Sequence, residues 1–269
     1  MFLKTLIQLI PRSKNISHET KLSQLLLKHV SLPYSHYNST LSKKRELDAV
    51  LFDVDGTLID SVDLHAKAWQ DAFRHYDYEV EFKLVREQIG DQLMPLFINE
   101  NVLKKIGDEL QEYRDQLFRE NYMSQVKAFP GVRSLFKMIK KRGVKIALAS
   151  SARENELQIY KRIANIEDLI DGETCSNSKD VKRSKPYPDI FLACLNVLKL
   201  SSKDNVIVVG DTQWDAKAAV AAGLKIVGVE CGGFSGDLLR QSGCQWVYKD
   251  IEQLTRYYDT LCKDVLRYE

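Results

Sequence analysis

From residue 47 onward, short apolar runs alternate with longer segments of helical periodicity. Four runs are typical of buried strands and span 47–52, 144–149, 206–210 and 224–229, with weaker candidates at 172–176 and 246–248. Helical periodicity predicts helices at 132–142, 154–163, 188–198, 215–222, 237–242 and 251–267. Continuous apolar strands that alternate with helices predict an α/β fold, with a parallel sheet covered on both faces.

The first two strand-like runs are separated by a long block without such runs. Residues 61–82 have helical periodicity, and residues 85–123 are rich in Lys and Glu. The sequence Phe129-Pro130-Gly131 then breaks the pattern. We therefore expect residues 62–129 to form a helical cap, inserted into a core made of residues 46–61 and 130–269.

Polar residues follow three of the predicted strands. Asp53, Ser150 and Asp211 stand where the first, second and third strong runs end. Ligands of open parallel sheets bind beyond the carboxyl ends of the strands. The three side chains are therefore expected to point into one crevice, which the inserted cap would cover.

Asp53 and Asp55 are separated by one residue in Asp-Val-Asp-Gly-Thr. If the strand persisted, both carboxylates would lie on the same side and repel each other. A divalent cation would relieve this repulsion, and oxygen ligands suit Mg²⁺. One carboxylate could then attack an electrophile while the other handles protons, with Gly56 permitting the sharp turn. Taken alone, the pattern also describes an Asp-rich turn after a strand.

Two further carboxylates follow the third strong run in Gly-Asp-Thr-Gln-Trp-Asp. Asp211 is placed to reach a metal held between strands. Asp215, one helical turn on, has three interpretations: a ligand through water, a group that positions Asp211, or a cap on the next helix. We expect the side chains of Asp53, Asp55 and Asp211 to converge on one Mg²⁺ ion.

Ser150, Ser151 and Lys185 are candidates for phosphate binding. Hydroxyl groups and free amides in the Ser150-Ser151 turn would suit a phosphate oxygen. Lys185 lies in Ser-Lys-Pro-Tyr-Pro, where two prolines restrict the backbone, and its ammonium could neutralise both phosphate and carboxylate. Each feature alone is also common, as a Ser-Ser loop or a solvated surface lysine.

Charge is unevenly distributed along the chain. Residues 1–45 hold eight Lys or Arg and a single acid, although the whole chain has a formal charge of only +2. The acidic remainder lacks the clustered basic charge of a nucleic-acid-binding protein. The basic extension could be poorly ordered, could direct import into an organelle, or could place residues 1–30 on a membrane surface. No apolar run is long enough to span a bilayer.

The five cysteines are scattered and form no Cys-x-x-Cys pair. This spacing suggests neither a zinc site nor a disulfide framework. Free thiols fit a reducing compartment best, so the sequence predicts a cytoplasmic protein.

The motifs Asp-x-Asp-Gly-Thr, Ser, Lys-Pro and Gly-Asp-x-x-x-Asp occur in one order, each in the expected strand context. In this respect residues 47–250 resemble the haloacid dehalogenase (HAD) superfamily of phosphohydrolases. The resemblance implies a Rossmann-like core with an inserted α-helical cap of the C1 type. It also implies Mg²⁺-dependent phosphoryl transfer through an aspartyl-phosphate.

Carried onto this sequence, the resemblance makes Asp53 the nucleophile and a metal ligand. It makes Asp55 the general acid/base, with its backbone carbonyl on the metal. The resemblance also implies that Ser150 and Lys185 hold the transferring phosphoryl group. It further implies that Asp211 completes the metal site with help from Asp215.

Within the superfamily, Asp60-Ser61 and Leu64-His65-x-x-Ala68-Trp69 look like phosphoglycolate-phosphatase-like and β-phosphoglucomutase-like members. His65 could contact substrate or hold the cap in its closed state. It could equally be a buried histidine whose hydrogen bonds are all made inside the helical cap. The chain departs from these relatives at residues 89–93, where a glycine-rich stretch is reduced to Gly90, which puts substrate specificity in doubt. Arg86 and Gln92 are the cap residues that we expect near the substrate.

The leading hypothesis is a phosphatase acting on a small phosphorylated metabolite. A sugar phosphomutase would use the same two aspartates, but its cap would hold a bisphosphate intermediate away from water. A dehalogenase would need neither Mg²⁺ nor the proton transfer assigned to Asp55. A phosphonate-cleaving enzyme would need a cap lysine such as Lys67 or Lys83 to form a Schiff base. A non-catalytic protein that binds a phosphorylated ligand is the last alternative.

Overall fold

The computed structural model describes residues 46–89 and 93–267. The expectations for residues 1–45, Gly90 and Gln92 lie outside the described residues. Within the described part of the chain, no helix combines the length and apolar character that crossing a membrane requires.

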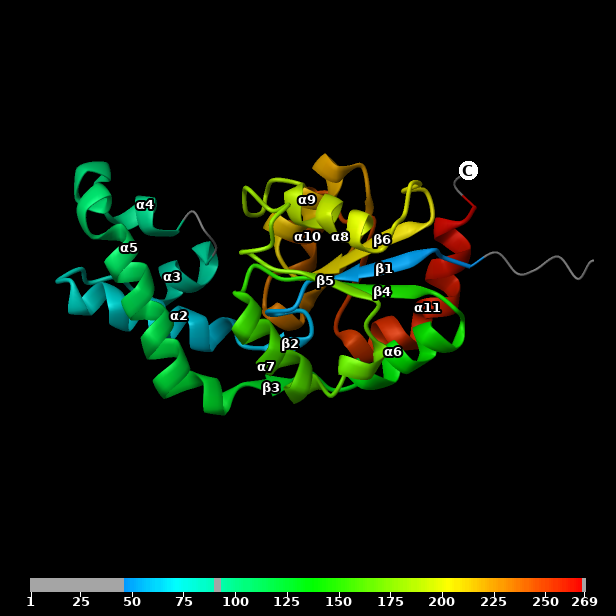
Figure 1. The fold of residues 1–269 in the computed structure, drawn as a ribbon, viewed down its shortest axis with the longest axis horizontal. Coiled ribbons are helices and arrows are strands. Elements are labelled where there is room, and N and C mark those ends of the chain that lie inside the picture. The colour runs from blue at the N-terminus through cyan, green and yellow to red at the C-terminus, as the bar shows by residue number, and fades with distance from the viewer. Residues whose placement is uncertain (1–45, 90–92, 268–269) are drawn as a thin grey trace, which may run out of the picture. The chain divides into compact units, whose positions relative to one another are not determined.

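The core is a six-stranded parallel sheet with the strand order β5-β4-β1-β6-β7-β8 (Figure 1). Its strands are Ala49–Phe52 (β1), Lys145–Ala149 (β4), Gly172–Thr174 (β5), Val206–Gly210 (β6), Lys225–Val229 (β7) and Trp246–Tyr248 (β8). The predicted parallel α/β fold is confirmed.

Helices cover both faces of this sheet (Figure 1). One set comprises Val132–Lys141 (α6), Glu154–Ala164 (α7) and Ile251–Val265 (α11), and the other comprises Asp189–Val197 (α8), Gln213–Ala222 (α9) and Gly236–Gln241 (α10). Alternate residues of β1 supply the two cores: Val50 and Phe52 pack with the first set, Ala49 and Leu51 with the second. Burial on both faces explains why the strand sequences are continuously apolar.

The inserted block is helical, as expected, and has an apolar cluster of its own. Its elements are Val62–His75 (α2), Phe82–Gln88 (α3), Leu93–Phe97 (α4), Glu100–Leu117 (α5), Phe118–Tyr122 (η1) and Met123–Gln125 (η2). The buried residues of the third apolar cluster all fall between Ala66 and Leu110. This separate cluster supports our proposal of a cap domain, and we refer to residues 62–125 as the cap.

Two details of the cap differ from the expectation. The helix predicted over 61–82 ends at His75, and Asp77 then adopts a φ of 64° in the following turn. Ile59–Asp60 (β2) and Lys127–Ala128 (β3) form a short antiparallel pair. This pair brings together the two points where the chain enters and leaves the cap.

Candidate active site

A tight turn after β1 places the first two aspartates. The Asp53 amide donates to the Val209 carbonyl at 2.9 Å, which ties the end of β1 to β6. The amides of Leu58 and Ile59 then both donate to the Val54 carbonyl, which folds the chain back on itself. Gly56 has a φ of 79°, which few other residues tolerate. The strand therefore ends before Asp55.

Three carboxylates meet at the carboxyl ends of β1 and β6. Oxygens of Asp53, Asp211 and Asp215 all lie within 4.8 Å of one another, and all three residues are buried. The Thr57 hydroxyl lies between two of them, 3.0 Å from Asp53 Oδ2 and 2.9 Å from Asp211 Oδ1. We call these three aspartates the acidic cluster.

Lys185 is the cation of the acidic cluster. Its Nζ donates to Asp53 Oδ1 and to the Ala149 carbonyl, and it lies 2.8 Å from Asp215 Oδ1. Burial acts to lower the pKa of Lys185, but the carboxylates of Asp215 and Asp53 outweigh it and raise that pKa. The lysine is therefore a cation, and it contacts the carboxylate at the end of the first strand.

One ammonium leaves the acidic cluster short of positive charge. Burial, together with the nearby Asp215, raises the pKa of Asp53 to about 7 even though Lys185 opposes the shift. Burial and the carboxylates of Asp53 and Asp215 also raise the pKa of Asp211 well above its ordinary value. Asp211 Oδ2 is buried and has no hydrogen-bond partner among the described residues. These features fit a divalent cation with oxygen ligands, such as Mg²⁺.

Asp215 also organises the start of α9. It forms a capping box with Thr212, in which the Thr212 hydroxyl accepts from the Asp215 amide at 3.1 Å and the Asp215 carboxylate accepts from the Thr212 amide at 3.1 Å. Of the three interpretations of Asp215, helix capping is therefore seen directly. Its other oxygen faces Lys185, so the capped helix also holds the lysine in place.

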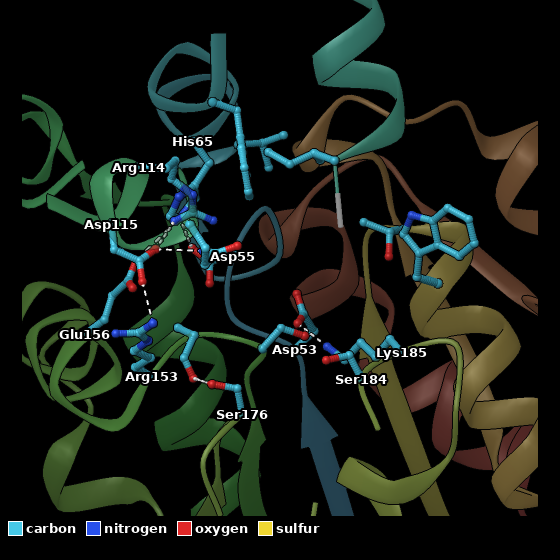
Figure 2. A pocket seen from close by; sticks show the side chains of 18 of the residues that line it. Asp53, Asp55, His65, Arg114, Asp115, Arg153, Glu156, Ser176, Ser184 and Lys185 are labelled. Carbon is cyan, nitrogen blue, oxygen red and sulfur yellow. Dashed lines mark hydrogen bonds and ion pairs between the residues drawn. The ribbon is translucent and has the colours of Figure 1, made fainter. Parts of the chain in front are cut away.

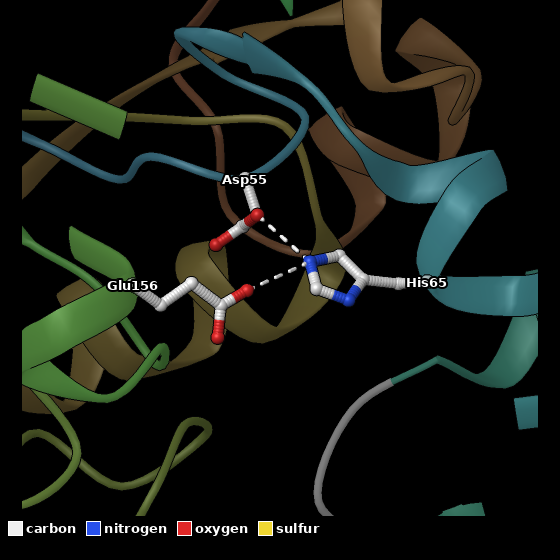
Figure 3. Close-up of side chains that lie close together, drawn as sticks. All are labelled: Asp55, His65 and Glu156. Carbon is white, nitrogen blue, oxygen red and sulfur yellow. Dashed lines mark hydrogen bonds and ion pairs between the residues drawn. The ribbon is translucent and has the colours of Figure 1, made fainter. Parts of the chain in front are cut away.

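The Asp55 carboxylate does not converge with Asp53 and Asp211, and this expectation was wrong. Asp55 Oδ1 accepts from the Ser61 hydroxyl at 2.6 Å and lies 3.1 Å from His65 Nε2 (Figure 3). Glu156 Oε1 lies 3.6 Å from the same His65 nitrogen. The physical reason is that β1 ends at Phe52, so the turn directs the two side chains apart.

His65 therefore connects the cap to the core. It is buried, it stacks on Phe118 at 3.8 Å, and its Nε2 lies 3.1 Å from the Tyr160 hydroxyl of α7. Burial acts to raise the pKa of Asp55, but hydrogen bonds and charge from His65 and the bond from Ser61 hold it below its ordinary value.

A cavity of about 420 Å³ opens beside these groups and is lined by both core and cap. Asp53, Asp55, His65 and Lys185 line it (Figure 2). Ser151 lines it as well. Ser150 and Asp211 were also expected to point into this crevice, but neither lines the cavity. The Ser150 side chain is fully buried, and its hydroxyl accepts from the Ala152 amide at 3.0 Å, which shapes the turn that presents Ser151.

Two glycines pack against Asp211. A Cβ on Gly56 would lie 2.3 Å from Asp211 Oδ2, and a Cβ on Gly232 would lie 1.7 Å from the same atom. Gly56 therefore supports the acidic cluster and does not line the cavity. The importance of Gly232 was missed, because a Gly-Gly pair after a strand gives no sign of what it faces.

The comparisons decide the family. A sequence model described as haloacid dehalogenase-like hydrolase matches residues 50–229, which include the acidic cluster and Lys185. The chain belongs to this family. The predicted resemblance is thereby confirmed, and so is the expectation of a hydrolase-type enzyme.

Relatives of this HAD-family protein are similar over most of its length. It is 28% identical over 220 residues to the phosphorylated carbohydrates phosphatase of Thermotoga maritima, covering 77% of this chain and 97% of that protein. It is 28% identical over 201 residues to the beta-phosphoglucomutase of Bacillus subtilis, covering 68% and 83%. A crystal structure of a hydrolase from Pseudomonas syringae superposes with a TM-score of 0.68 at 25% identity, covering 80% and 99%.

Arg86 does not line the cavity, contrary to its predicted contact with substrate. Its Nη2 donates to the Gly232 carbonyl, its Nε donates to Asp63 Oδ1 at 2.9 Å, and its guanidinium lies 5.4 Å from the Phe234 ring centre. The reason is that α3 lies against the loop after β7, so Arg86 fastens the cap to the core in this HAD-family protein.

This role predicts that Arg86→Ala loosens α3. Losing a charged hydrogen bond and a ring contact should speed amide exchange in residues 82–88 by about 5- to 30-fold, as measured by hydrogen–deuterium exchange mass spectrometry. Lys83→Ala is the matched control, because Lys83 is 80% exposed on the same helix. Equal exchange rates in the two variants would rule out the fastening role.

Proposed function

We propose that the protein is a Mg²⁺-dependent phosphatase that hydrolyses a small phosphorylated metabolite through an aspartyl-phosphate. The observation that carries this proposal is the position of Asp53. Its carboxylate lines the cavity while Lys185 and Thr57 hold its oxygens inside the acidic cluster. A nucleophile fixed in this way is presented to a ligand without needing to reorganise.

The acidic cluster supplies the groups that would hold the ion. Asp53 and Asp211 would bind it, with the backbone carbonyl of Asp55 as a further ligand. Asp215 would act through its hold on Lys185 and on α9. When bound, Mg²⁺ would offset the negative charge of the phosphoryl oxygens and the carboxylates.

The residues of the chain account for each step. An Asp53 oxygen attacks phosphorus and the bond from phosphorus to the ester oxygen breaks. Asp55, in its protonated form, donates a proton to the departing oxygen. Asp55 then removes a proton from water, which attacks the aspartyl-phosphate, releases phosphate and restores Asp53. Lys185 and Ser151 face the phosphoryl group from the cavity wall.

A sugar phosphomutase is the second candidate, and the similarity to a beta-phosphoglucomutase favours keeping it. Both reactions begin with the same Asp53 chemistry. The two candidates differ in what accepts the phosphoryl group, which is water in one case and a sugar hydroxyl in the other. Neither Lys67 nor Lys83 lines the cavity, and both are exposed, so these two cap lysines do not support a Schiff-base mechanism.

The proposed function predicts phosphate release that depends on Mg²⁺. The purified protein is assayed against a panel of phosphorylated sugars and acids, with excess Mg²⁺ or with EDTA. We expect EDTA to lower the rate by about 100-fold or more, because the cation offsets charge that one lysine cannot. Product sugars are identified in the same assays. Isomer formation without phosphate release would indicate the mutase, and equal rates with and without EDTA would contradict the metal requirement.

A further inference from the structure

The cavity has a second charged region, away from the acidic cluster. Arg114 and Asp115 come from α5 of the cap, and Arg153 precedes α7 of the core. All three line the cavity. Figure 2 shows them on the side opposite Asp53 and Lys185, with Asp55 and His65 between. A ligand whose phosphoryl group lies at Asp53 would therefore extend its other end toward the arginines.

Asp115 holds the two arginines together. Its Oδ1 lies 3.1 Å from Arg114 Nη1, and its Oδ2 lies 2.9 Å from Arg153 Nη2. Gln111 Nε2 donates to the same carboxylate at 2.9 Å, and Asp115 is only 8% exposed. With three partners around it, this buried carboxylate is occupied in positioning both guanidinium groups.

The two arginines share a single ion-pair partner among the described residues. Within residues 46–89 and 93–267, Asp115 is the single carboxylate that forms an ion pair with either arginine. Glu156 of α7 lines the same cavity and lies within the electrostatic influence of Arg114, but it faces His65 and accepts from the Tyr160 hydroxyl. Two guanidinium groups, with five N–H donors each, therefore share one carboxylate. The pair therefore retains N–H donors for a ligand.

The two guanidinium groups are also supported differently. Arg114 lies 4.8 Å from the Trp69 ring centre, and its side chain is 15% exposed. The Arg153 side chain is 53% exposed at the cavity rim. One arginine is thus fixed inside the cavity, and the other is free to adjust to a ligand. Planar guanidinium groups are suited to carboxylate and phosphate oxygens.

We propose that Arg114 and Arg153 bind a second anionic group of the substrate, so that the preferred substrates are phosphate monoesters that also carry a carboxylate or another phosphate. This inference rests on the proposed phosphatase function. Asp115 is a positioning residue in this arrangement. The volume of about 420 Å³ leaves room for a carbon skeleton between the two charged ends.

Matched substrates test the inference. Glycerol 3-phosphate and 3-phosphoglycerate differ by a carboxylate, and fructose 6-phosphate and fructose 1,6-bisphosphate differ by a phosphate. We expect kcat/KM to be at least about 10-fold higher for the more anionic member of at least one pair, mainly through KM. The pair that shows this preference identifies the second anion. Ratios near one for both pairs would overturn the inference.

Arginine variants test the residues. The ratio of kcat/KM between the more and the less anionic member of a pair should fall by at least about 10-fold in Arg153→Ala and in Arg114→Ala. Each substitution removes charged donors that would bind the second anion. Arg119→Ala is the control, since Arg119 is exposed at the end of the same helical run and does not line the cavity. Arg153 is half exposed, so its variant tests the inference even if Arg114→Ala fails to fold. An unchanged ratio in Arg153→Ala would overturn the inference.

The outcomes also separate this inference from the proposed function. Suppose that glycerol 3-phosphate and fructose 6-phosphate release phosphate and that no preference depends on the arginines. That result would support the phosphatase function and refute the second anion site. Absence of Mg²⁺-dependent release from these four compounds and from the whole panel of phosphorylated sugars and acids would refute both.

Discussion

Replacing Asp53 with Asn should abolish Mg²⁺-dependent phosphate release, with kcat/KM falling at least about 1000-fold. The amide cannot form the aspartyl-phosphate, so the loss should appear in kcat rather than in KM. Burial and Asp215 already raise the pKa of Asp53 to about 7, which means that its charged form is disfavoured in the fold. The neutral side chain should therefore not lower the melting temperature.

Asp48→Asn is the matched control for this variant. Asp48 precedes the same strand and is exposed, so it tests the loss of one carboxylate near β1 without touching the cavity. Turnover close to that of the wild-type protein in Asp53→Asn would remove Asp53 as the nucleophile. The same outcome would also remove the aspartyl-phosphate from the mechanism.

The strands and the acidic cluster could be predicted from the sequence because local patterns encode both. A strand buried on two faces must be apolar at every position, as Val50 and Leu51 illustrate by packing into opposite cores. Parallel strands also bring their carboxyl ends together, so Asp53 and Asp211 could be placed at one edge without knowing any distance.

What the sequence could not show depends on contacts between distant segments. Alternation suggested that Asp55 would join Asp53, but the strand ends first and the carboxylate finds Ser61 and His65 instead. Arg86 lay near the expected substrate contacts in sequence, yet α3 packs against the loop that carries Gly232. Arg114 gave no signal at all, because a basic residue in a charged helix is usually solvated.

Replacing Gly232 with Ala should damage the acidic cluster without changing any charged residue. The new methyl group would lie 1.7 Å from Asp211 Oδ2 and 2.5 Å from its Cγ, so either Asp211 or the loop must move. Displacement of a reacting group by about 1 Å can cost about 100-fold in rate. We expect a loss of that size in kcat/KM, and a higher Mg²⁺ concentration at half-maximal activity.

A second glycine shows whether this loss is specific to the site. Gly107 lies inside α5, where the nearest atom to an added Cβ is 3.9 Å away. Gly107→Ala should retain activity and gain up to about 1 kcal/mol in helix stability. Because Gly232→Ala perturbs Asp211, a proposed metal ligand, the Mg²⁺ titration of this variant should shift while its melting temperature in EDTA changes little. Wild-type Mg²⁺ dependence in this variant would show that the position of Asp211 does not control metal binding.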